Sequence, residues 1–351
     1  MNDDSVTWAV VLGALSERRE LTRTQAGWAM EQILTGLATD AQIGAFLLGL
    51  RAKGETANEV SALMDVMNAH AINVNVPGVV VDVVGTGGDL SHSVNISTMA
   101  ALVVAASGVH VVKHGNRAAS SQTGAADVLE ELGLSLAKGP DEVAADVARC
   151  GIGFCFAPNF HPALRFAGPV RKELGVPTVL NILGPLENPA NASSGLVGCA
   201  NRELAPVMAQ ALAERGNFAF VVRGDDGLDE ITTATTSTLW DTTSGVVREF
   251  TLDPSELGIS VPDPTALRGG DRLENARLLR ETLTSGTGPI ADAVRLNAAA
   301  ALVAHDCAIA GGKYPGFEAP LVERISAAMV DSTNALTSGA AAQLLDRWLS
   351  E

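Results

Sequence analysis

Positive charge is scarce in this sequence. It has 24 Lys and Arg residues against 40 Asp and Glu, which gives a formal net charge of −16 over 351 residues. Nucleic-acid-binding proteins usually carry a basic surface that neutralises phosphates, and the basic residues here are scattered. Apolar runs are also short, since none reaches the roughly 18 residues of a membrane span. We therefore expect neither a nucleic-acid nor a membrane partner.

Cysteine is rare as well, with four residues at Cys150, Cys155, Cys199 and Cys307. No His or Cys lies near the first two at zinc-site spacing, so buried free thiols are expected. The N-terminus carries acidic residues where a signal peptide carries basic ones. Together these features predict a protein of the reducing cytoplasm.

The composition is that of a folded protein, with 47% hydrophobic and 18% charged residues. This length allows one large or two medium domains. Residues 1–72 show helical periodicity, as at Trp8, Val11, Leu12 and Leu15, and no strand signal. They predict a helical bundle or cap that packs on another surface, for which a dimer partner is one candidate.

After Pro77 the pattern alternates between strands and helices, which is typical of a parallel sheet. The valine run Val79–Val84, broken only by Asp82, predicts a strand buried on both faces. The expected fold class is α/β: a small helical N-terminal domain plus a larger α/β domain with a central, mostly parallel sheet. The further strands expected are Val109–Val112, Leu134–Leu136, Ile152–Ala157, Leu196–Gly198 and Phe218–Val222, with β character in Ile231–Phe250. The helices expected are Thr98–Ser107, Ala126–Leu132, Pro140–Cys150, Glu203–Arg215, Leu278–Leu283, Ile290–His305 and Leu321–Leu349, and Asn181–Pro189 and Pro262–Asn275 are expected as loops.

A glycine-rich loop, Gly85-Thr86-Gly87-Gly88-Asp89, follows the first of these strands. Its backbone N–H groups can point at an anion, and Asn95 or Ser97 can cap the helix that follows. The second strand delivers Lys113-His114-Gly115-Asn116-Arg117 to the same edge of the sheet, where ligands of α/β folds bind. The loop is neither the GxGxxG nor the GxxxxGK[ST] motif. We interpret it as a phosphate site in which Lys113 is either a phosphate partner or a surface residue.

Asp229 and Glu230 end an acidic cluster that follows the strand Phe218–Val222. The pair is either a solvated turn or a Mg²⁺ site, because Mg²⁺ is usually held by one or two carboxylates together with substrate phosphates. Because a phosphate site is predicted at the glycine-rich loop, we favour the Mg²⁺ interpretation. His114 and His161 fit no Ser/His/Asp pattern, so no catalytic acid, base or nucleophile is assigned. Of Arg165 and Arg171, six residues apart, we expect one to face the site and bind a carboxylate.

These motifs, in this order, resemble the anthranilate phosphoribosyltransferases of tryptophan biosynthesis. The resemblance covers essentially the whole chain and rests on GTGGD at 85–89, NIST at 95–98, KHGNRAASS at 113–121, PVRKELG at 169–175, NILGPL at 181–186 and DGLDE at 226–230. It implies transfer of the phosphoribosyl group of 5-phosphoribosyl 1-pyrophosphate to the amino group of anthranilate, the second step from chorismate. It also implies a helical domain of residues 1–75 with 166–190, an α/β domain of 76–165 and 191–351, and a homodimer joined through the helical domains.

The resemblance also implies the site residues and two Mg²⁺ ions. Those that would bind the phosphoribosyl donor are Gly85, Thr86, Gly87, Gly88, Asp89, Asn95, Ser97, Thr98, Lys113, Ser120 and Ser121. Those that would bind or line anthranilate are Gly85, His114, Asn116, Arg171 and Pro185. Those that would bind Mg²⁺ are Ser97, Asp229 and Glu230.

Two residues depart from the family pattern. Leu90 stands where a glycine is usual, and Phe166 replaces a frequent histidine. These departures leave open that another aminobenzoate is the acceptor. Two rival interpretations of the whole chain are a pyrimidine nucleoside phosphorylase and a non-enzymatic or nucleic-acid-binding homologue.

Overall fold

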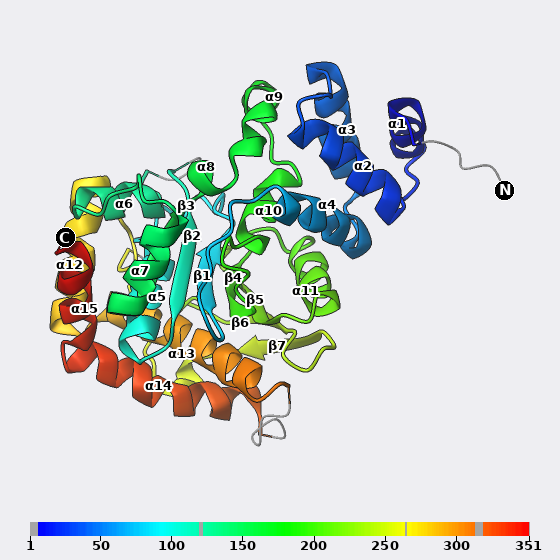
Figure 1. Ribbon diagram of the computed structural model, residues 1–351. Helices are drawn as coiled ribbons and strands as arrows, with labels where there is room; N and C mark the ends of the chain where they lie inside the picture. Colours follow the sequence, from blue (N-terminus) through cyan, green and yellow to red (C-terminus); the bar gives the residue numbers. More distant parts are fainter. Residues whose placement is uncertain (1–5, 119–121, 264, 313–318, 351) are drawn as a thin grey trace.

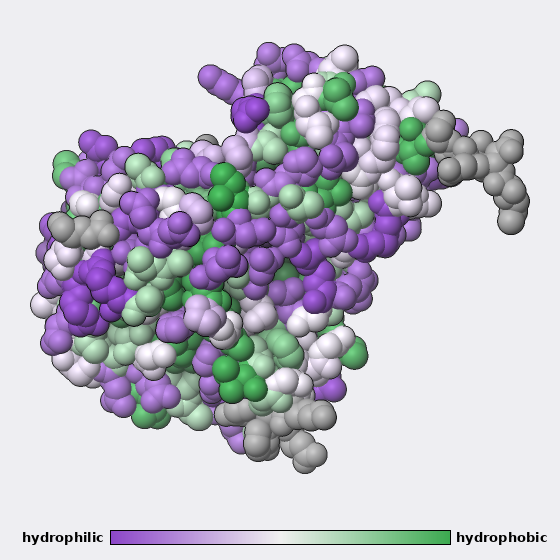
Figure 2. Space-filling model, in the orientation of Figure 1, coloured by the Kyte–Doolittle hydropathy of each residue, from purple (hydrophilic) through white to green (hydrophobic). Residues whose placement is uncertain are grey.

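The computed structural model describes residues 6–118, 122–263, 265–312 and 319–350. A small helical part projects from a larger α/β part, with the C-terminal helices on the far side of the latter (Figure 1). This confirms the predicted fold class. Over the face seen in Figure 2, hydrophobic residues form only small scattered groups. Within the described ranges, no helix combines the length and the apolar character needed to cross a membrane.

The helical part begins with four helices: α1 (Trp8–Ser16), α2 (Arg23–Leu34), α3 (Asp40–Lys53) and α4 (Ala57–Ala69). Thr22, Thr39 and Thr56 each form a capping box with the residue three positions later, so the sequence itself defines where α2, α3 and α4 begin. The apolar faces of these helices share one core with α9 (Gly168–Leu174), α10 (Leu180–Leu186) and α11 (Ala205–Glu214). Val84, Val197, Val221 and Trp240 belong to the same core, so this core extends from the helices into the α/β part.

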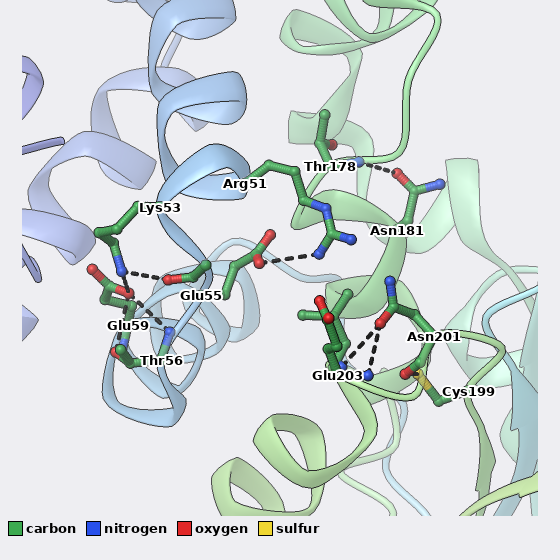
Figure 3. Close-up of polar contacts among 12 residues, drawn as sticks. Arg51, Lys53, Glu55, Thr56, Glu59, Thr178, Asn181, Cys199, Asn201 and Glu203 are labelled. Atoms are coloured by element: carbon green, nitrogen blue, oxygen red, sulfur yellow. Dashed lines mark hydrogen bonds and ion pairs between the residues drawn. The ribbon is translucent and has the colours of Figure 1, made fainter. Parts of the chain in front are cut away.

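Buried charges hold the turn between α3 and α4. Glu59 is fully buried, and its carboxylate accepts hydrogen bonds from Leu21 N at 2.7 Å and from Lys53 Nζ at 2.8 Å. Arg51 and Glu55 form a second pair at 3.3 Å, on the side of α3 that faces Thr178, Asn181 and Asn201 (Figure 3). Because a buried carboxylate without partners is costly, the bonds of Glu59 fix the end of α3 to the start of α4 and to the segment just before α2.

The seven-stranded sheet has the order β3-β2-β1-β4-β5-β6-β7, in which the first five strands are parallel and the last two pairings are antiparallel. The order reverses direction between β1 and β4, which is where open α/β sheets form their ligand crevice. The strands are β1 (Val81–Gly85), β2 (Val111–Gly115), β3 (Ile152–Phe156), β4 (Ser194–Gly198), β5 (Phe218–Gly224), β6 (Ser237–Asp241) and β7 (Arg248–Leu252).

Helices cover both faces of the sheet, because alternate strand residues point to opposite sides. Val81 and Val83 of β1 belong to the core formed with α5 (Ile96–Ala106) and α13 (Pro289–Ile309). Val84 belongs to the core that includes α11, and Val80, just before β1, packs with α7 (Pro140–Cys150). The other helices are α6 (Ala125–Glu131), α8 (Ala157–Phe160), α12 (Arg272–Ser285), α14 (Leu321–Thr337), α15 (Ala340–Leu349) and the short 3₁₀ helices Pro162–Phe166 and Pro254–Leu257.

Four sequence predictions are corrected. Leu134–Leu136 is a loop, not a strand; its leucines pack on the core from that loop, which mimics strand alternation. The predicted loop Asn181–Pro189 is helical through Leu186, with Pro185 inside α10. The predicted loop Pro262–Asn275 ends early, because Asp271 caps α12 by accepting from Glu274 N at 2.9 Å. The long helix Leu321–Leu349 is interrupted at Gly339, which adopts a φ of 77°. The four cysteines are buried free thiols, as predicted.

Candidate active site

The carboxylate Asp229 lies over the ends of β1 and β4, where each strand finishes in a glycine. A Cβ atom on Gly85 would lie 2.3 Å from Asp229 Oδ2, and one on Gly198 would lie 1.6 Å from the Asp229 carbonyl oxygen. Both distances are shorter than van der Waals contact. The glycines of β1 and β4 therefore make the room in which the acidic loop after β5 reaches the switch point of the sheet.

The acidic pair is bonded to the two segments predicted to bind phosphate. Asp229 Oδ2 accepts a hydrogen bond from Gly87 N at 2.7 Å, and Glu230 Oε1 accepts one from Ser97 N at 3.0 Å. Asp229 and Glu230 are both buried, which rules out the solvated-turn interpretation. The structure thus brings the glycine loop, the start of α5 and the predicted metal ligands into one place.

Lys113 also reaches this place, but from inside β2 and not from the loop after it. Its side chain is 1% exposed, and Nζ donates to Val83 O at 2.6 Å and lies 3.4 Å from Ser97 Oγ. Burial lowers the pKa of Lys113, whereas the charges of Asp82, Glu230 and Asp229 raise it. The Lys113 side chain is therefore buried beside Asp229 and Glu230, and the surface interpretation is wrong.

Burial and repulsion from neighbouring carboxylates disfavour the negative charges of Asp229 and Glu230 in this structure. Burial, and then the charge of Asp89, raise the pKa of Asp229 to about 7. Burial, and then the charge of Asp229, raise the pKa of Glu230 to about 8. Glu230 Oε2 is buried without a hydrogen-bond partner among the described residues. Two adjacent hard oxygen ligands, one of them unpartnered, fit Mg²⁺.

Three or more metal-ligating side chains do not cluster anywhere in the described part of the chain. An ion at Asp229 and Glu230 would therefore take its other ligands from water and substrate phosphates, as Mg²⁺ commonly does. Ser97, in the first turn of α5, makes two contacts beside this pair. Its Oγ lies 3.4 Å from Lys113 Nζ, and its N–H donates to Glu230. The buried hydroxyl of Thr98 has no hydrogen-bond partner among the described residues.

The other residues predicted to bind the phosphoribosyl donor lie on the loop after β1. Thr86 Oγ1 accepts from Ala200 N at 3.3 Å, and Asp89 accepts two hydrogen bonds from Ser91. Gly87 and Gly88 have φ values of 67° and 81°, the left-handed region that glycine enters without strain. Leu90 has a φ of 57° and is 69% exposed, so this leucine occupies a conformation suited to glycine. Ser120 and Ser121 lie outside the described residues.

On the other side of β2 lies a pair of buried histidines. The rings of His114 and His161 are 5.2 Å apart and inclined by 67°. His161 Nε2 donates to Glu187 O at 3.2 Å, whereas His114 Nε2 is buried without a hydrogen-bond partner among the described residues. Burial, followed by the charges of His161 and Lys113, lowers the pKa of His114 to about 3, and burial lowers the pKa of His161 to about 4. Both imidazoles are therefore neutral, and His161 holds the end of α10.

The residues predicted to bind anthranilate come from three elements. Asn116 is exposed just after β2, and its Oδ1 accepts from Arg117 N at 2.7 Å. Arg171 lies on α9, where burial lowers its pKa, and its side chain has no hydrogen-bond or ion-pair partner among the described residues. Pro185 lies on α10. No hydrogen bond joins these three side chains to one another within the described residues.

Arg165 and Phe166 face the helical part. The Arg165 guanidinium lies 4.6 Å from the centre of the Phe166 ring, a cation–π contact. The Phe166 ring packs against Gly36, since a Cβ atom on this glycine would lie only 2.7 Å from the ring. Arg165 is therefore engaged locally, and among the described residues of this segment Arg171 is left as the unpaired guanidinium.

Sequence reasoning missed the role of Asp82. This buried carboxylate accepts from His114 N at 3.2 Å and from Asn188 Nδ2 at 2.7 Å, and Asn188 also donates to Val112 O at 2.7 Å. Burial raises the pKa of Asp82 to about 6, against the lowering effect of Lys113. Asp82 thus links β1 and β2 to the segment that returns from the helical part. The one signal in the sequence was an aspartate inside a valine run.

Known proteins match this chain along nearly its full length. A family profile described as "Glycosyl transferase family, helical bundle domain" matches residues 10–71, and one described as "Glycosyl transferase family, a/b domain" matches residues 77–341. The anthranilate phosphoribosyltransferase of Rhodococcus jostii (strain RHA1) is 54% identical over 342 residues, which is 97% of this chain and 92% of the relative. The chain belongs to the anthranilate phosphoribosyltransferase family. This confirms the resemblance inferred from the motifs.

Solved anthranilate phosphoribosyltransferases share the fold. The crystal structure from Thermus thermophilus has a TM-score of 0.87 at 37% identity, covering 97% of this chain and 98% of that one. The Saccharomyces cerevisiae enzyme in complex with PRPP and Mg has a TM-score of 0.83 at 27% identity, covering 97% of this chain and 96% of that one. Family membership therefore extends over both the helical and the α/β parts.

Proposed function

We propose that this chain transfers the phosphoribosyl group of 5-phosphoribosyl 1-pyrophosphate to the amino group of anthranilate. The products are N-(5-phosphoribosyl)anthranilate and pyrophosphate. The observation that carries the proposal is the convergence of three buried charged side chains on one place. Asp229 and Glu230 accept from the N–H groups of Gly87 and Ser97, and Lys113 Nζ lies 3.4 Å from Ser97 Oγ. A pyrophosphate leaving group needs both anion-binding N–H donors and charge neutralisation, and this site offers both.

In this proposal the donor lies along the glycine loop and the start of α5. Gly85, Thr86, Gly87, Gly88 and Asp89 line the pyrophosphate and ribose, while Asn95, Ser97, Thr98 and Lys113 bind phosphate oxygens. Asp229, Glu230 and Ser97 would hold Mg²⁺, which when bound neutralises charge on the departing pyrophosphate. That two ions bind stays a prediction.

Anthranilate is proposed to bind between β2, α9 and α10. The Arg171 guanidinium, unpaired among the described residues, suits the carboxylate of the acceptor. Asn116 offers an exposed amide, and the neutral His114 lines the pocket with Pro185 and Gly85. The bond from ribose C1 to pyrophosphate breaks, a bond from C1 to the amine nitrogen forms, and the nitrogen releases one proton to water. The aromatic amine already carries a free lone pair, so no nucleophilic side chain is needed.

A homodimer through the helical parts is also proposed. Val10 on α1, Leu37 before α3, Leu48 on α3 and Val176 after α9 are exposed aliphatic residues of the helical part, at 42%, 69%, 48% and 47%. Covering them with a second copy of the chain would remove this apolar area from water. A single species of twice the chain mass in analytical ultracentrifugation is expected.

The reaction is tested by following the fluorescence of anthranilate after adding 5-phosphoribosyl 1-pyrophosphate, with and without Mg²⁺. Fluorescence should be lost only when the donor and Mg²⁺ are both present. A parallel reaction with 4-aminobenzoate tests the acceptor. Consumption of 4-aminobenzoate with anthranilate left intact would overturn the assigned acceptor, and consumption of neither would overturn the proposed reaction.

A further inference from the structure

Asn275, in the first turn of α12, uses both ends of its side-chain amide next to the predicted donor site. The residue is 3% exposed. Its Nδ2 donates to Asn95 Oδ1 at 2.9 Å, and its Oδ1 accepts from Gly270 N at 2.8 Å. None of the motifs that identify the family contains Asn275, which lies 180 residues from Asn95 in the sequence.

The hydrogen bonds of Asn95 continue this network. Asn95 is the residue before α5, yet its side chain does not cap the helix. Instead its Nδ2 donates to Thr123 O at 3.1 Å, and Thr123 Oγ1 donates to Gly270 O at 3.0 Å. The chain from Asn275 through Asn95 and Thr123 to Gly270 is therefore a closed ring, which joins the segments before α5, before α6 and before α12.

Backbone contacts hold the same segments together. Val94 N donates to Leu267 O at 2.9 Å, and Gly269 N donates to His92 O at 2.8 Å. A Cβ on Gly269 would lie 2.6 Å from Asn275 Oδ1, so the amide is closely packed against the loop. The Asn275 side chain consequently has little freedom to turn, and its two bonds fix which way the Asn95 amide faces.

We propose that Asn275 is a positioning residue for phosphate binding by this enzyme. By donating to Asn95 Oδ1, it keeps Asn95 Nδ2 as the end that faces Thr123, with a second N–H left for a phosphate oxygen. It also holds the segment that leads into Ser97, whose N–H bonds Glu230. This inference rests on the proposed function only in that the phosphates are those of the donor.

The test is Asn275→Asp. The carboxylate still accepts from Gly270 N but can no longer donate to Asn95, so one bond of the ring is lost with little change of volume. The dissociation constant of inorganic pyrophosphate, measured by calorimetry with Mg²⁺ present, should rise by about five- to tenfold, as expected for one lost hydrogen bond. The KM for the donor should rise by a similar factor and the KM for anthranilate by less than about twofold.

Asn68→Asp is the matched control. Asn68 Nδ2 donates to Asn191 Oδ1 at 2.9 Å, an Asn–Asn bond on α4 outside the site. This variant should bind pyrophosphate as the wild type does. Asn275→Ser is measured beside it, because the shorter, neutral hydroxyl also loses the bond to Asn95 but adds no negative charge near the phosphates. It should show a loss of pyrophosphate affinity as well.

Unchanged pyrophosphate binding in a folded Asn275 variant would overturn the proposal, and so would equal losses for pyrophosphate and anthranilate. Calorimetry separates this outcome from failure of the proposed function. A wild type that binds pyrophosphate but consumes no anthranilate overturns the reaction, whereas the comparison of wild type and Asn275→Asp still decides the role of Asn275.

Discussion

The donor and acceptor halves of the proposed site are built in different ways. The donor half has buried ionisable side chains and hydrogen bonds between separate segments. Asp229 bonds Gly87, Glu230 bonds Ser97, and Lys113 bonds Val83 of β1. The acceptor half places Asn116, Arg171 and Pro185 after β2, on α9 and on α10, with no hydrogen bond among them in the described ranges. One half is preorganised, and the other depends on how two parts of the chain meet.

This difference follows from topology. Parallel strands deliver their carboxyl ends to one edge, so the proposed donor-binding residues after β1 and β5 and within β2 come together at a single sheet. Arg171 and Pro185 instead belong to the stretch that packs with α1–α4. The Asp82–Asn188 bond and His161, by holding the segment after α10, tie this stretch back to β1 and β2. Substitutions in the two halves should therefore have different effects.

The largest effect is expected for Asp229→Asn, which removes a ligand from the preorganised half. The amide keeps the shape but not the charge, so kcat at limiting Mg²⁺ should fall by about 100-fold or more. Fluorescence assays over a Mg²⁺ titration measure this loss. Asp225→Asn, on an exposed acid of the same loop, should stay within about twofold of the wild type. Full activity of Asp229→Asn at limiting Mg²⁺ would contradict the metal role.

Arg171→Ala tests the acceptor half and should have the next largest effect. Loss of a charged hydrogen bond to the anthranilate carboxylate should raise the KM of anthranilate by roughly 10- to 100-fold. The KM of the donor should change by less than about twofold. Lys172→Ala, on the neighbouring exposed residue, is the control. If both KM values rose equally for Arg171→Ala, the separation into two halves would be wrong.

The histidine pair should make the acceptor half sensitive to acid. The pKa of His161 is lowered to about 4, so the unfolded chain binds a proton below pH 6.5 that the folded chain does not. The contribution of His161 to the free energy of unfolding is therefore fully present above pH 6.5, and it is lost as the pH falls from 6.5 towards 4. At pH 5 the expected loss from His161 is about 2 kcal/mol.

Urea unfolding at pH 7.5 and pH 5 measures this effect. His161→Gln should show a smaller loss between the two pH values than the wild type does, because glutamine does not titrate. His110→Gln, at an exposed histidine, should keep the wild-type dependence. Equal pH dependence in His161→Gln and the wild type would show that the buried pair does not carry the effect.

Leu90→Gly, in the donor half, should have the smallest effect, which is a change in the free energy of unfolding. A left-handed φ costs a leucine about 1 to 2 kcal/mol, and the extra freedom of glycine in the unfolded chain offsets part of the gain. We expect a net stabilisation below about 1 kcal/mol in urea unfolding. Leu90→Ala keeps the Cβ atom and should give no gain. A destabilised Leu90→Gly would mean that the leucine side chain makes up for its backbone strain.

The sequence was sufficient for what depends on local pattern. The helical periodicity of residues 1–72, the valine run Val79–Val84 and the glycine-rich loop predicted their elements directly. It was insufficient for partners distant in the chain. Nothing near Asn275 or Asp82 indicates that they bond to Asn95 and Asn188, because those pairings arise only when the sheet and helices are assembled. Leu134–Leu136 shows the opposite error, since loop leucines that fill a core imitate a strand.

The bonds from Asp229 and Glu230 to Gly87 N and Ser97 N have a consequence for selectivity. In this structure the carboxylates of Asp229 and Glu230 accept hydrogen bonds from the N–H groups that a bound phosphate would use. The two carboxylates therefore compete with a phosphate for these N–H groups. A ligand gains these donors only by exchange, and exchange frees two carboxylates in a buried site. A lone anion leaves them uncompensated, whereas an anion that arrives with a divalent cation satisfies them. If the site binds Mg²⁺ and a diphosphate as proposed, this exchange would favour a metal–diphosphate over simple oxyanions before any contact with the sugar is made.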